Sequence, residues 1–264
     1  MHYLINFIRH YLSATFIDVL HSPFVFDLYQ QCIRRQKNKP RVFNEIEKIR
    51  KGLKINHQTL SYTDFGASAK TLDSVEKVEI AALAKRHLKP ARIAQILYYI
   101  IHKYHYQNLL ELGTSLGITT SYLASGASPT DATIHTIEGC QDVREVALST
   151  FSKLSLNSKI MSHEGKFDEV LPDILAQISV LDFLFVDGNH SYEATLHYFQ
   201  QCLPKANNNS VFIFDDIYWS KGMTRAWEEI KNHPQVTVSV DLFFIGLIFF
   251  RKEQEKQQFK LRVL

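Results

Sequence analysis

The chain has 264 residues, a formal net charge of +3, and 45% hydrophobic and 22% charged residues. These values are typical of a globular protein that can bury a large core, and they exclude a disordered or fibrous chain. The Lys and Arg residues are scattered along the sequence, so we expect no nucleic-acid partner.

Three cysteines, Cys32, Cys140 and Cys202, are widely spaced, and their pattern predicts neither a disulfide framework nor a metal site. Free thiols favour a reducing compartment, and we therefore expect a cytoplasmic protein. The longest uncharged apolar runs, 93–101 and 242–250, are too short to span a bilayer, and the N-terminus lacks the apolar core of a signal peptide. We expect no membrane association.

Residues 1–65 are expected to form a helical arm. Apolar residues recur at helical spacing along its first part and mark one face: Leu4, Ile5, Ile8, Leu12 and Phe16. A second helix is predicted to begin at Ser22 and Pro23, because Ser caps a helix and Pro suits its first turn. The arm can serve for packing, for a homodimer, or as a lid over a substrate pocket, and the pattern does not separate these roles.

Further helices are expected over 43–53, 75–87 and 91–104, with an irregular stretch at 62–74. From residue 108 the pattern alternates between strands and helices. The strands are expected at 109–112, 133–137, 159–162, 181–186, 211–214, 236–240 and 245–250, and the helices near 117–125, 142–154, 168–178, 191–203 and 221–231.

This alternation predicts an α/β domain over residues 66–264, with a mainly parallel, Rossmann-like sheet of seven strands and helices on both faces. The last two strands are joined by only a few residues, so they must form an antiparallel pair. Right-handed crossovers then bring the carboxyl ends of the parallel strands, and any ligand, to one edge of the sheet.

A glycine turn follows the first of these strands. Glu111 and Gly113 end the strand, and Gly117 opens the next helix. The glycines allow a sharp turn, and the free N–H groups of the helix start favour an anion. No Gly-Lys-Ser/Thr follows, and the third glycine of the dinucleotide fingerprint is missing. Glu-x-Gly-x-x-x-Gly instead resembles the first motif of class I methyltransferases that use S-adenosylmethionine (SAM).

Two further turns extend this resemblance. Glu138 ends the second strand, followed by Gly139, at the spacing expected of a carboxylate that accepts from both ribose hydroxyls. A simple strand-end acid would have the same pattern. The third strand leads into Gly165, Lys166 and Phe167, which resemble the adenine-contacting segment of small-molecule O-methyltransferases.

Carboxylates also follow the fourth and fifth strands. Asp187 ends one apolar run, and Asp215 and Asp216 end the next. Neighbouring parallel strands bring such residues to the same edge, where three carboxylates repel one another unless a cation neutralises them. An all-oxygen set suits a divalent cation such as Mg²⁺. Strand-end aspartates that only cap the next helix are the alternative.

Asp187, Asp215, Asp216 and Trp219 resemble the metal-binding pattern of cation-dependent O-methyltransferases, including the catechol, caffeoyl-CoA and antibiotic-sugar enzymes. The resemblance covers roughly residues 65–250. One departure concerns the base: where those enzymes have Lys or Asp, this chain has Asn189, which cannot accept a proton, and His190, which can.

The resemblance implies an enzyme that transfers a methyl group from SAM to a hydroxyl of a small molecule with the help of a divalent cation. It implies that SAM is held by the turn residues and by the acid beside its sulfonium: Glu111, Gly113, Ser115, Gly117, Glu138, Gly139, Gly165, Lys166, Phe167 and Asp187. His190 and Asp187 would be catalytic. Two alternatives remain: a metal-free methyltransferase acting on another kind of acceptor, and a SAM-binding scaffold subunit without catalysis.

Overall fold

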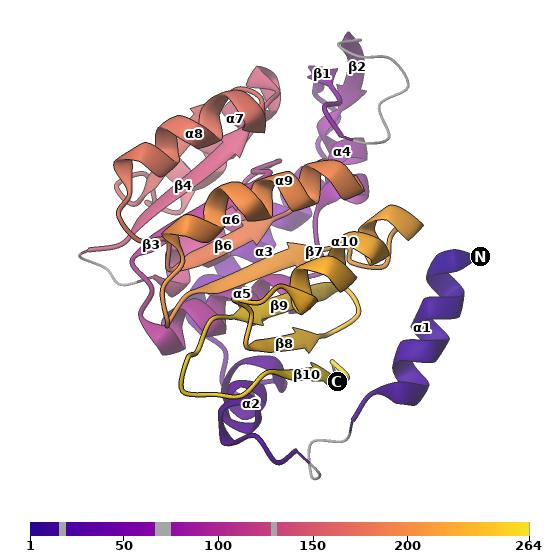
Figure 1. The fold of residues 1–264 in the computed structure, drawn as a ribbon. Helices are drawn as coiled ribbons and strands as arrows, with labels where there is room; N and C mark the ends of the chain where they lie inside the picture. The colour runs from indigo at the N-terminus through magenta and orange to yellow at the C-terminus, as the bar shows by residue number, and fades with distance from the viewer. Residues whose placement is uncertain (16–19, 67–74, 128–130, 264) are drawn as a thin grey trace. The chain divides into compact units, whose positions relative to one another are not determined.

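The computed structural model describes residues 1–15, 20–66, 75–127 and 131–263. Phe16 and most of the stretch expected to be irregular, 67–74, lie outside these ranges. The chain divides into two compact units, and Figure 1 shows its elements in sequence colours. Unit 1 contains Met1–Arg35 and Leu175–Leu264, and unit 2 contains Gln36–Ile174.

Unit 2 consists of helices, an antiparallel pair of strands, and three parallel strands. Its elements in chain order are α3 (Arg41–Leu53), β1 (Thr59–Thr63), β2 (Val75–Glu79), α4 (Ile80–His87), α5 (Ala91–Tyr104), β3 (Asn108–Leu112), α6 (Ile118–Gly126), β4 (Thr133–Glu138), α7 (Gln141–Lys153), β5 (Ile160–Glu164) and α8 (Phe167–Gln177). The helices bury aromatic rings together: the centroid of Phe43 on α3 lies 4.8 Å from that of Tyr98 on α5 and 5.0 Å from that of Tyr122 on α6.

The three strands β3, β4 and β5 are parallel, with β4 in the middle. Leu112 pairs with Ile137, and Glu138 pairs with Glu164, so the carboxyl ends of all three strands are level. β3 and β4 are buried at most of their positions, as parallel strands covered on both faces are, whereas β5 has one buried residue, Ile160. The predicted SAM residues of this unit therefore follow strand ends that lie side by side.

Unit 1 combines N-terminal helices with five strands. Its elements are α1 (His2–Ser13), α2 (Pro23–Leu28), the π-helical turn η2 (Tyr29–Ile33), β6 (Phe183–Val186), α9 (Tyr192–Cys202), the short η3 (Leu203–Lys205), β7 (Val211–Asp215), α10 (Lys221–Asn232), β8 (Val238–Asp241), β9 (Ile245–Phe249) and β10 (Gln257–Lys260). The strands lie in the order β10-β8-β9-β7-β6. β7 is parallel to β6, whereas β9 is antiparallel to both β7 and β8.

The predicted α/β class, its parallel strands and its antiparallel C-terminal pair are confirmed. The expected cap is also present, since Ser22 Oγ accepts from Val25 N at 3.4 Å and Pro23 begins α2. The described residues add three strands to the seven expected, namely β10 and the separate pair β1 and β2. Within them, no helix is both long and apolar enough to cross a bilayer.

The helix expected over 75–87 begins only at Ile80, and residues 75–79 form β2 instead. β2 pairs with β1, which places Val78 opposite Leu60, and both side chains are buried. Glu76, Lys77 and Glu79 favour helix by propensity, but pairing with β1 overrides that preference.

Helix α1 packs on the rest of unit 1, and the face that it uses differs from the apolar face that the sequence pattern indicated. Tyr3 and Phe7 each lie with ring centroids 5.0 Å from that of Phe243, and His10 Nε2 lies 3.1 Å from an Asp241 carboxylate oxygen. The described part of the predicted apolar face remains exposed: Leu4, Ile5, Ile8 and Leu12. Four large apolar side chains of α1 therefore lie on a surface that nothing in the described chain covers.

Candidate functional site

The turn after β3 has an unusual backbone. Gly113, Ser115 and Gly117 all have positive φ, at 104°, 49° and 79°. A left-handed residue other than glycine is uncommon, so Ser115 is held there by its surroundings. Gly117 cannot be replaced freely, because a Cβ atom at this position would lie 2.7 Å from Phe151 Cε1. The result is a tight turn that leads directly into α6.

Glu138 fixes this turn from the end of β4. Its Oε2 accepts a hydrogen bond from the Ser115 backbone N–H at 2.8 Å, and its Oε1 accepts from Cys140 N at 3.0 Å. Burial raises the pKa of the Glu138 carboxyl, while the bonds from Cys140 and Ser115 oppose that rise. The structure thus brings Glu138 and the glycine turn together, as the sequence predicted.

Glu111 lies inside the unit rather than at the strand edge. Its side chain is fully buried and accepts from Thr120 Oγ1 at 2.5 Å and from Thr136 Oγ1 at 2.7 Å. These bonds connect β3 to α6 and to β4. Glu111 therefore holds the turn in position, and its predicted contribution to SAM binding would act through that support.

The third turn follows β5. Gly165 has φ 135°, and its N–H donates to the Glu138 carbonyl at 3.1 Å. A Cβ atom there would lie 2.7 Å from Val170 Cγ2, so the turn is closely packed against α8. Lys166 precedes that helix and Phe167 is its first residue. All of the predicted SAM residues in unit 2 thus lie in three adjoining turns or, for Glu111, directly beneath them.

Sequence reasoning missed the loop after β1, which borders these turns. A Cβ atom added to Gly139 would lie 2.5 Å from Phe65 Cδ2, and Lys166 Nζ lies 5.5 Å from the centroid of the Phe65 ring. Phe65 has no signal of its own in the sequence, because its neighbours come from residues more than seventy positions away.

Unit 1 contains a cluster of possible metal ligands. Among the residues that the structure describes, ligand atoms of Asp187, His190 and Asp215 all lie within 4.8 Å of one another. His190 Nε2 is 3.7 Å from Asp187 Oδ1, and Asp215 is almost fully buried. Asp187 follows β6 and Asp215 ends the neighbouring β7, which is the strand-end arrangement that the sequence predicted.

The third predicted acid, Asp216, is not in this cluster. Its φ is 52°, and its N–H donates to the Phe244 carbonyl at 2.8 Å, so the chain turns sharply after Asp215. Trp219 follows in the same turn, with its N–H on the Asp216 carbonyl and its ring largely exposed. His190 occupies the third place of the cluster instead.

The donor set fits a divalent cation. Two carboxylates and one imidazole within 4.8 Å could share one ion, and without an ion the two carboxylates would repel each other. An imidazole ligand suits Mn²⁺, Fe²⁺ or Zn²⁺ better than Mg²⁺, which prefers oxygen. If His190 accepts a proton through Nε2, that atom cannot also be a ligand, so the two roles exclude each other.

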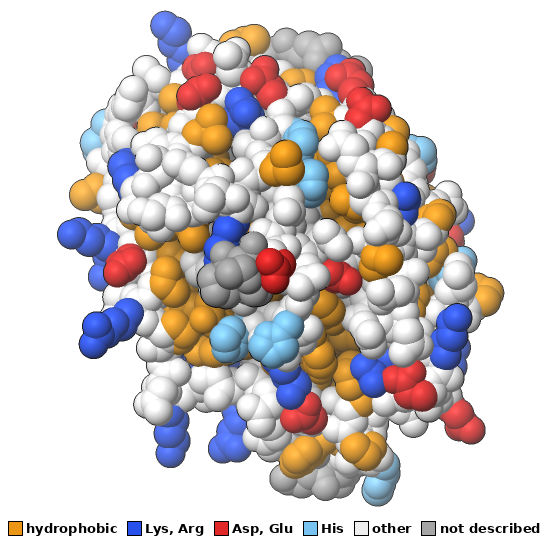
Figure 2. Space-filling view, turned by 90° about the vertical axis from the view of Figure 1, so that its left-hand side faces the viewer, with side chains coloured by type: hydrophobic (Ala, Val, Ile, Leu, Met, Phe, Trp, Pro, Cys, Tyr) orange, Lys and Arg blue, Asp and Glu red, His pale blue; other side chains and the backbone are white. Residues whose placement is uncertain are grey.

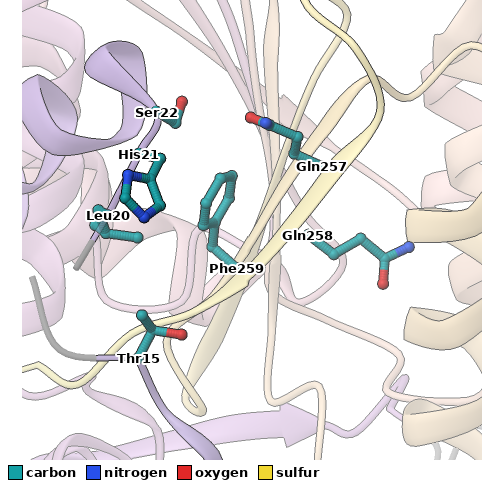
Figure 3. Close-up of a pocket in the computed structure, with 7 residues that line it drawn as sticks. All are labelled: Thr15, Leu20, His21, Ser22, Gln257, Gln258 and Phe259. Carbon is teal, nitrogen blue, oxygen red and sulfur yellow. The ribbon is translucent and has the colours of Figure 1, made fainter.

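The charged side chains and one pocket are two other features of the surface. Figure 2 shows acidic and basic side chains interspersed on the face that it draws. Unit 1 also has an open pocket of about 360 Å³, lined by Thr15 and by the segments 20–22 and 257–259. Figure 3 shows His21 and Phe259 beside each other there, with Gln258 directed elsewhere, to Asn232. The pocket contains none of the predicted site residues.

Similarity to known proteins identifies the fold independently of these contacts. Residues 110–217 match a family described as "Methyltransferase domain". This stretch includes the glycine turn, Glu138, the turn after β5, and Asp187 with Asp215 and Asp216. The predicted resemblance to class I methyltransferases is confirmed. No curated protein sequence matches the chain.

Three solved structures illustrate the likeness. The O-methyltransferase TomG from Streptomyces achromogenes, in complex with SAM, is 20% identical, with a TM-score of 0.55 over 62% of this chain and 82% of that one. An O-methyltransferase from Bacillus cereus in complex with SAH is 19% identical, with a TM-score of 0.58 over 81% and 92%. The SAH-bound methyltransferase PaMTH1 from Podospora anserina is 12% identical, with a TM-score of 0.60 over 88% and 97%. At these identities the likeness shows the fold.

Proposed function

We propose that this protein is a SAM-dependent O-methyltransferase that acts on a hydroxyl group of a small molecule. The observation that carries the proposal is Glu138, whose carboxylate bridges the glycine turn after β3 and the start of α7. The matched methyltransferase domain supports it, and so do the fold relatives that were crystallised with SAM or SAH.

The unit 2 turns have the chemistry to bind SAM. The carboxylate of Glu138 has lone pairs beyond the two N–H bonds that it accepts, and these can accept from the ribose hydroxyls. The tight turn at Gly113 and Gly117 lets the backbone approach the methionine end closely. Gly139 and the turn at Gly165–Phe167 would border the adenine.

The unit 1 cluster has the chemistry to prepare an acceptor. A divalent cation held by Asp187, Asp215 and a third ligand would lower the pKa of an acceptor hydroxyl. The third ligand is either His190 or Asp216. If His190 is not a ligand, its imidazole would accept the hydroxyl proton, and Asp187, 3.7 Å from it, would stabilise the imidazolium that results. Methyl transfer then depends mainly on holding the two reactants in line.

Two other functions are alternatives to this one. A metal-free methyltransferase acting on a non-hydroxyl acceptor would use the same SAM turns and would be active in EDTA. A SAM-binding scaffold subunit would bind SAM without transferring its methyl group. The cluster of Asp187, His190 and Asp215 favours the cation-assisted enzyme over both.

Titration of the protein with Mn²⁺, followed by electron paramagnetic resonance, tests the proposed cation site. Methyl transfer from labelled SAM to a panel of hydroxylated compounds is measured alongside it. We expect Asp215→Asn to weaken Mn²⁺ binding at least about ten-fold and to remove the EDTA-sensitive activity, because it removes a buried carboxylate ligand. SAM affinity should not change. Asp173→Asn, at an exposed position on α8, is the matched control.

Comparing His190→Gln with Asp216→Asn identifies the third ligand, since only the true ligand's loss weakens Mn²⁺ binding. Unchanged Mn²⁺ binding in Asp215→Asn would contradict the metal site. If activity also survived in EDTA, the metal-free alternative would replace it.

A further inference from the structure

Phe65 lies directly on the turn that is proposed to border the cofactor's nucleoside. The ring is so close to Gly139 that a Cβ atom at that position would meet its Cδ2 at 2.5 Å and its Cε2 at 2.9 Å. Gly139 is the residue after Glu138. Phe65 therefore occupies the space that a side chain at position 139 would fill in another protein.

The same ring contacts the neighbouring turn. Lys166 Nζ is 5.5 Å from the Phe65 ring centroid, within the range of a cation–π interaction. The Gly165 N–H donates to the Glu138 carbonyl, so this hydrogen bond joins the turns at Glu138 and Gly165. The ring thus spans both turns that carry the proposed ribose and adenine contacts.

The segment that carries Phe65 is anchored to unit 2 rather than loosely attached. Ser61 N donates to an Asp142 carboxylate oxygen at 2.8 Å, and Cys140 Sγ donates to the Ser61 carbonyl at 3.3 Å. Burial raises the pKa of the nearby Tyr62 hydroxyl, and the charges of Asp64 and Glu138 add to that rise, so the segment lies within electrostatic reach of Glu138. The Asp64 carboxylate closes the turn by accepting from Gly66 N at 2.8 Å.

Phe65 is also 37% exposed, so its side chain is not enclosed in the core of unit 2. A ring that served only to fill the core would be buried. A partly exposed aromatic residue beside two glycine turns is suited to a planar base, since every base has a π-face that stacks on an aromatic ring. Gly139, which lacks a side chain, cannot provide that surface itself.

We propose that Phe65 is the stacking surface for the adenine of the cofactor, so that a residue outside the matched methyltransferase domain completes the nucleoside site. This inference rests on the proposed function, because it takes SAM as the ligand. It assigns part of the cofactor site to the loop after β1, within the segment that the sequence pattern assigned to a separate arm.

Calorimetric titration with SAH tests this inference. We expect Phe65→Ala to weaken SAH binding about ten-fold or more, as loss of one base–aromatic stack does, and Phe65→Tyr to keep the wild-type affinity. Adenosine should show the same loss in Phe65→Ala. Methionine, which has no base, should bind both proteins equally. Phe26→Ala on α2 is the matched control, since Phe26 is 42% exposed, and it should bind SAH as the wild type does.

Two results would overturn the inference while leaving the proposed function intact. One is a Phe65→Ala protein that binds SAH as tightly as the wild type. The other is equal weakening of SAH and methionine binding, which would indicate that Phe65 only supports the fold of the turns. A wild-type protein that binds no SAH would instead overturn the proposed function, and this inference with it.

Discussion

At the scale of single residues, the stacked pair His135 and His163 makes stability depend on pH. The rings lie 5.2 Å apart, with Nδ1 of His135 and Nε2 of His163 separated by 3.0 Å. Burial lowers the pKa of both imidazoles. The neighbouring His163 lowers the pKa of His135 further, and the charge of Arg144 lowers the pKa of His163 further. The folded state therefore holds fewer protons on these groups than the unfolded state near pH 6.5.

Because the unfolded state binds more protons, protonation of these two histidines favours unfolding. We therefore expect their contribution to the free energy of unfolding to be greatest above pH 6.5, the pKa of an unfolded histidine. It should fall as the pH drops from 6.5 through the lowered pKa values of the folded state. Urea unfolding at a series of pH values measures this. We expect His163→Gln to reduce the pH dependence, whereas His57→Gln, at an exposed position, should leave it unchanged. Equal pH dependence in all three proteins would contradict the assignment.

The sequence predicted the position of a residue correctly where that residue lies at the end of a strand. Glu138 and Asp215 lie at strand ends as expected, since the alternation of strand and helix fixes that edge. It could not foresee which third residue joins Asp187 and Asp215. Asn189 and Asp216 both have positive φ, at 44° and 52°, and such turns redirect the next side chains in ways that the sequence pattern does not encode.

At the scale of elements, α1 is a helix with an apolar face that the described chain leaves exposed. Exposed apolar residues of α1 and of Met1, which precedes it, recur at positions i, i+3, i+4 and i+7, the spacing of one helix face: Met1, Leu4, Ile5, Ile8, Tyr11 and Leu12. The opposite face is already used, because Tyr3 and Phe7 pack on Phe243.

We propose that a second copy of the chain covers this face. From their exposed fractions the six residues present on the order of 700 Å², close to the ~800 Å² that each partner contributes to a standard interface. A face this apolar on a short helix suits isologous pairing with the same face of another copy. A membrane surface is a poorer partner, because α1 carries one Arg and no Lys.

Sedimentation equilibrium over a range of protein concentrations tests the dimer. We expect a dimer that Ile8→Asp converts to a monomer, since the change buries a charge at the centre of the interface. Ile55→Asp, at an exposed position in unit 2, should remain dimeric. A wild-type monomer at every concentration, with binding to anionic vesicles, would favour the membrane instead.

Element prediction failed where tertiary pairing decides the local structure. Residues 75–79 have the composition of a helix, yet they pair with β1, and β10 gives no stronger signal than its neighbours until it pairs with β8. By contrast, the helix Ala91–Tyr104 was predicted to its ends, because its apolar periodicity is strong and Pro90 precedes it.

At the scale of the whole molecule, the fold follows from the regular alternation of strands and helices after residue 108, and the matched methyltransferase domain at 110–217 lies within that region. The expected boundary at residue 65 rests on the helical pattern of the residues before it and on the start of the family resemblance, and it remains a prediction. The structure groups residues 1–35 with 175–264, and it gives residues 36–66 to the unit that carries the SAM turns. Such grouping depends on contacts between distant segments, which periodicity does not report.

The central claim is that the three turns of unit 2 bind SAM, and calorimetric titration of the purified protein with SAM tests it most directly. We expect saturable binding that Glu138→Ala weakens at least about ten-fold, because the charged acceptor for the ribose hydroxyls is lost. Glu164→Ala, at the paired position on β5, should bind SAM as the wild type does. Absence of SAM binding in the wild-type protein would contradict the account.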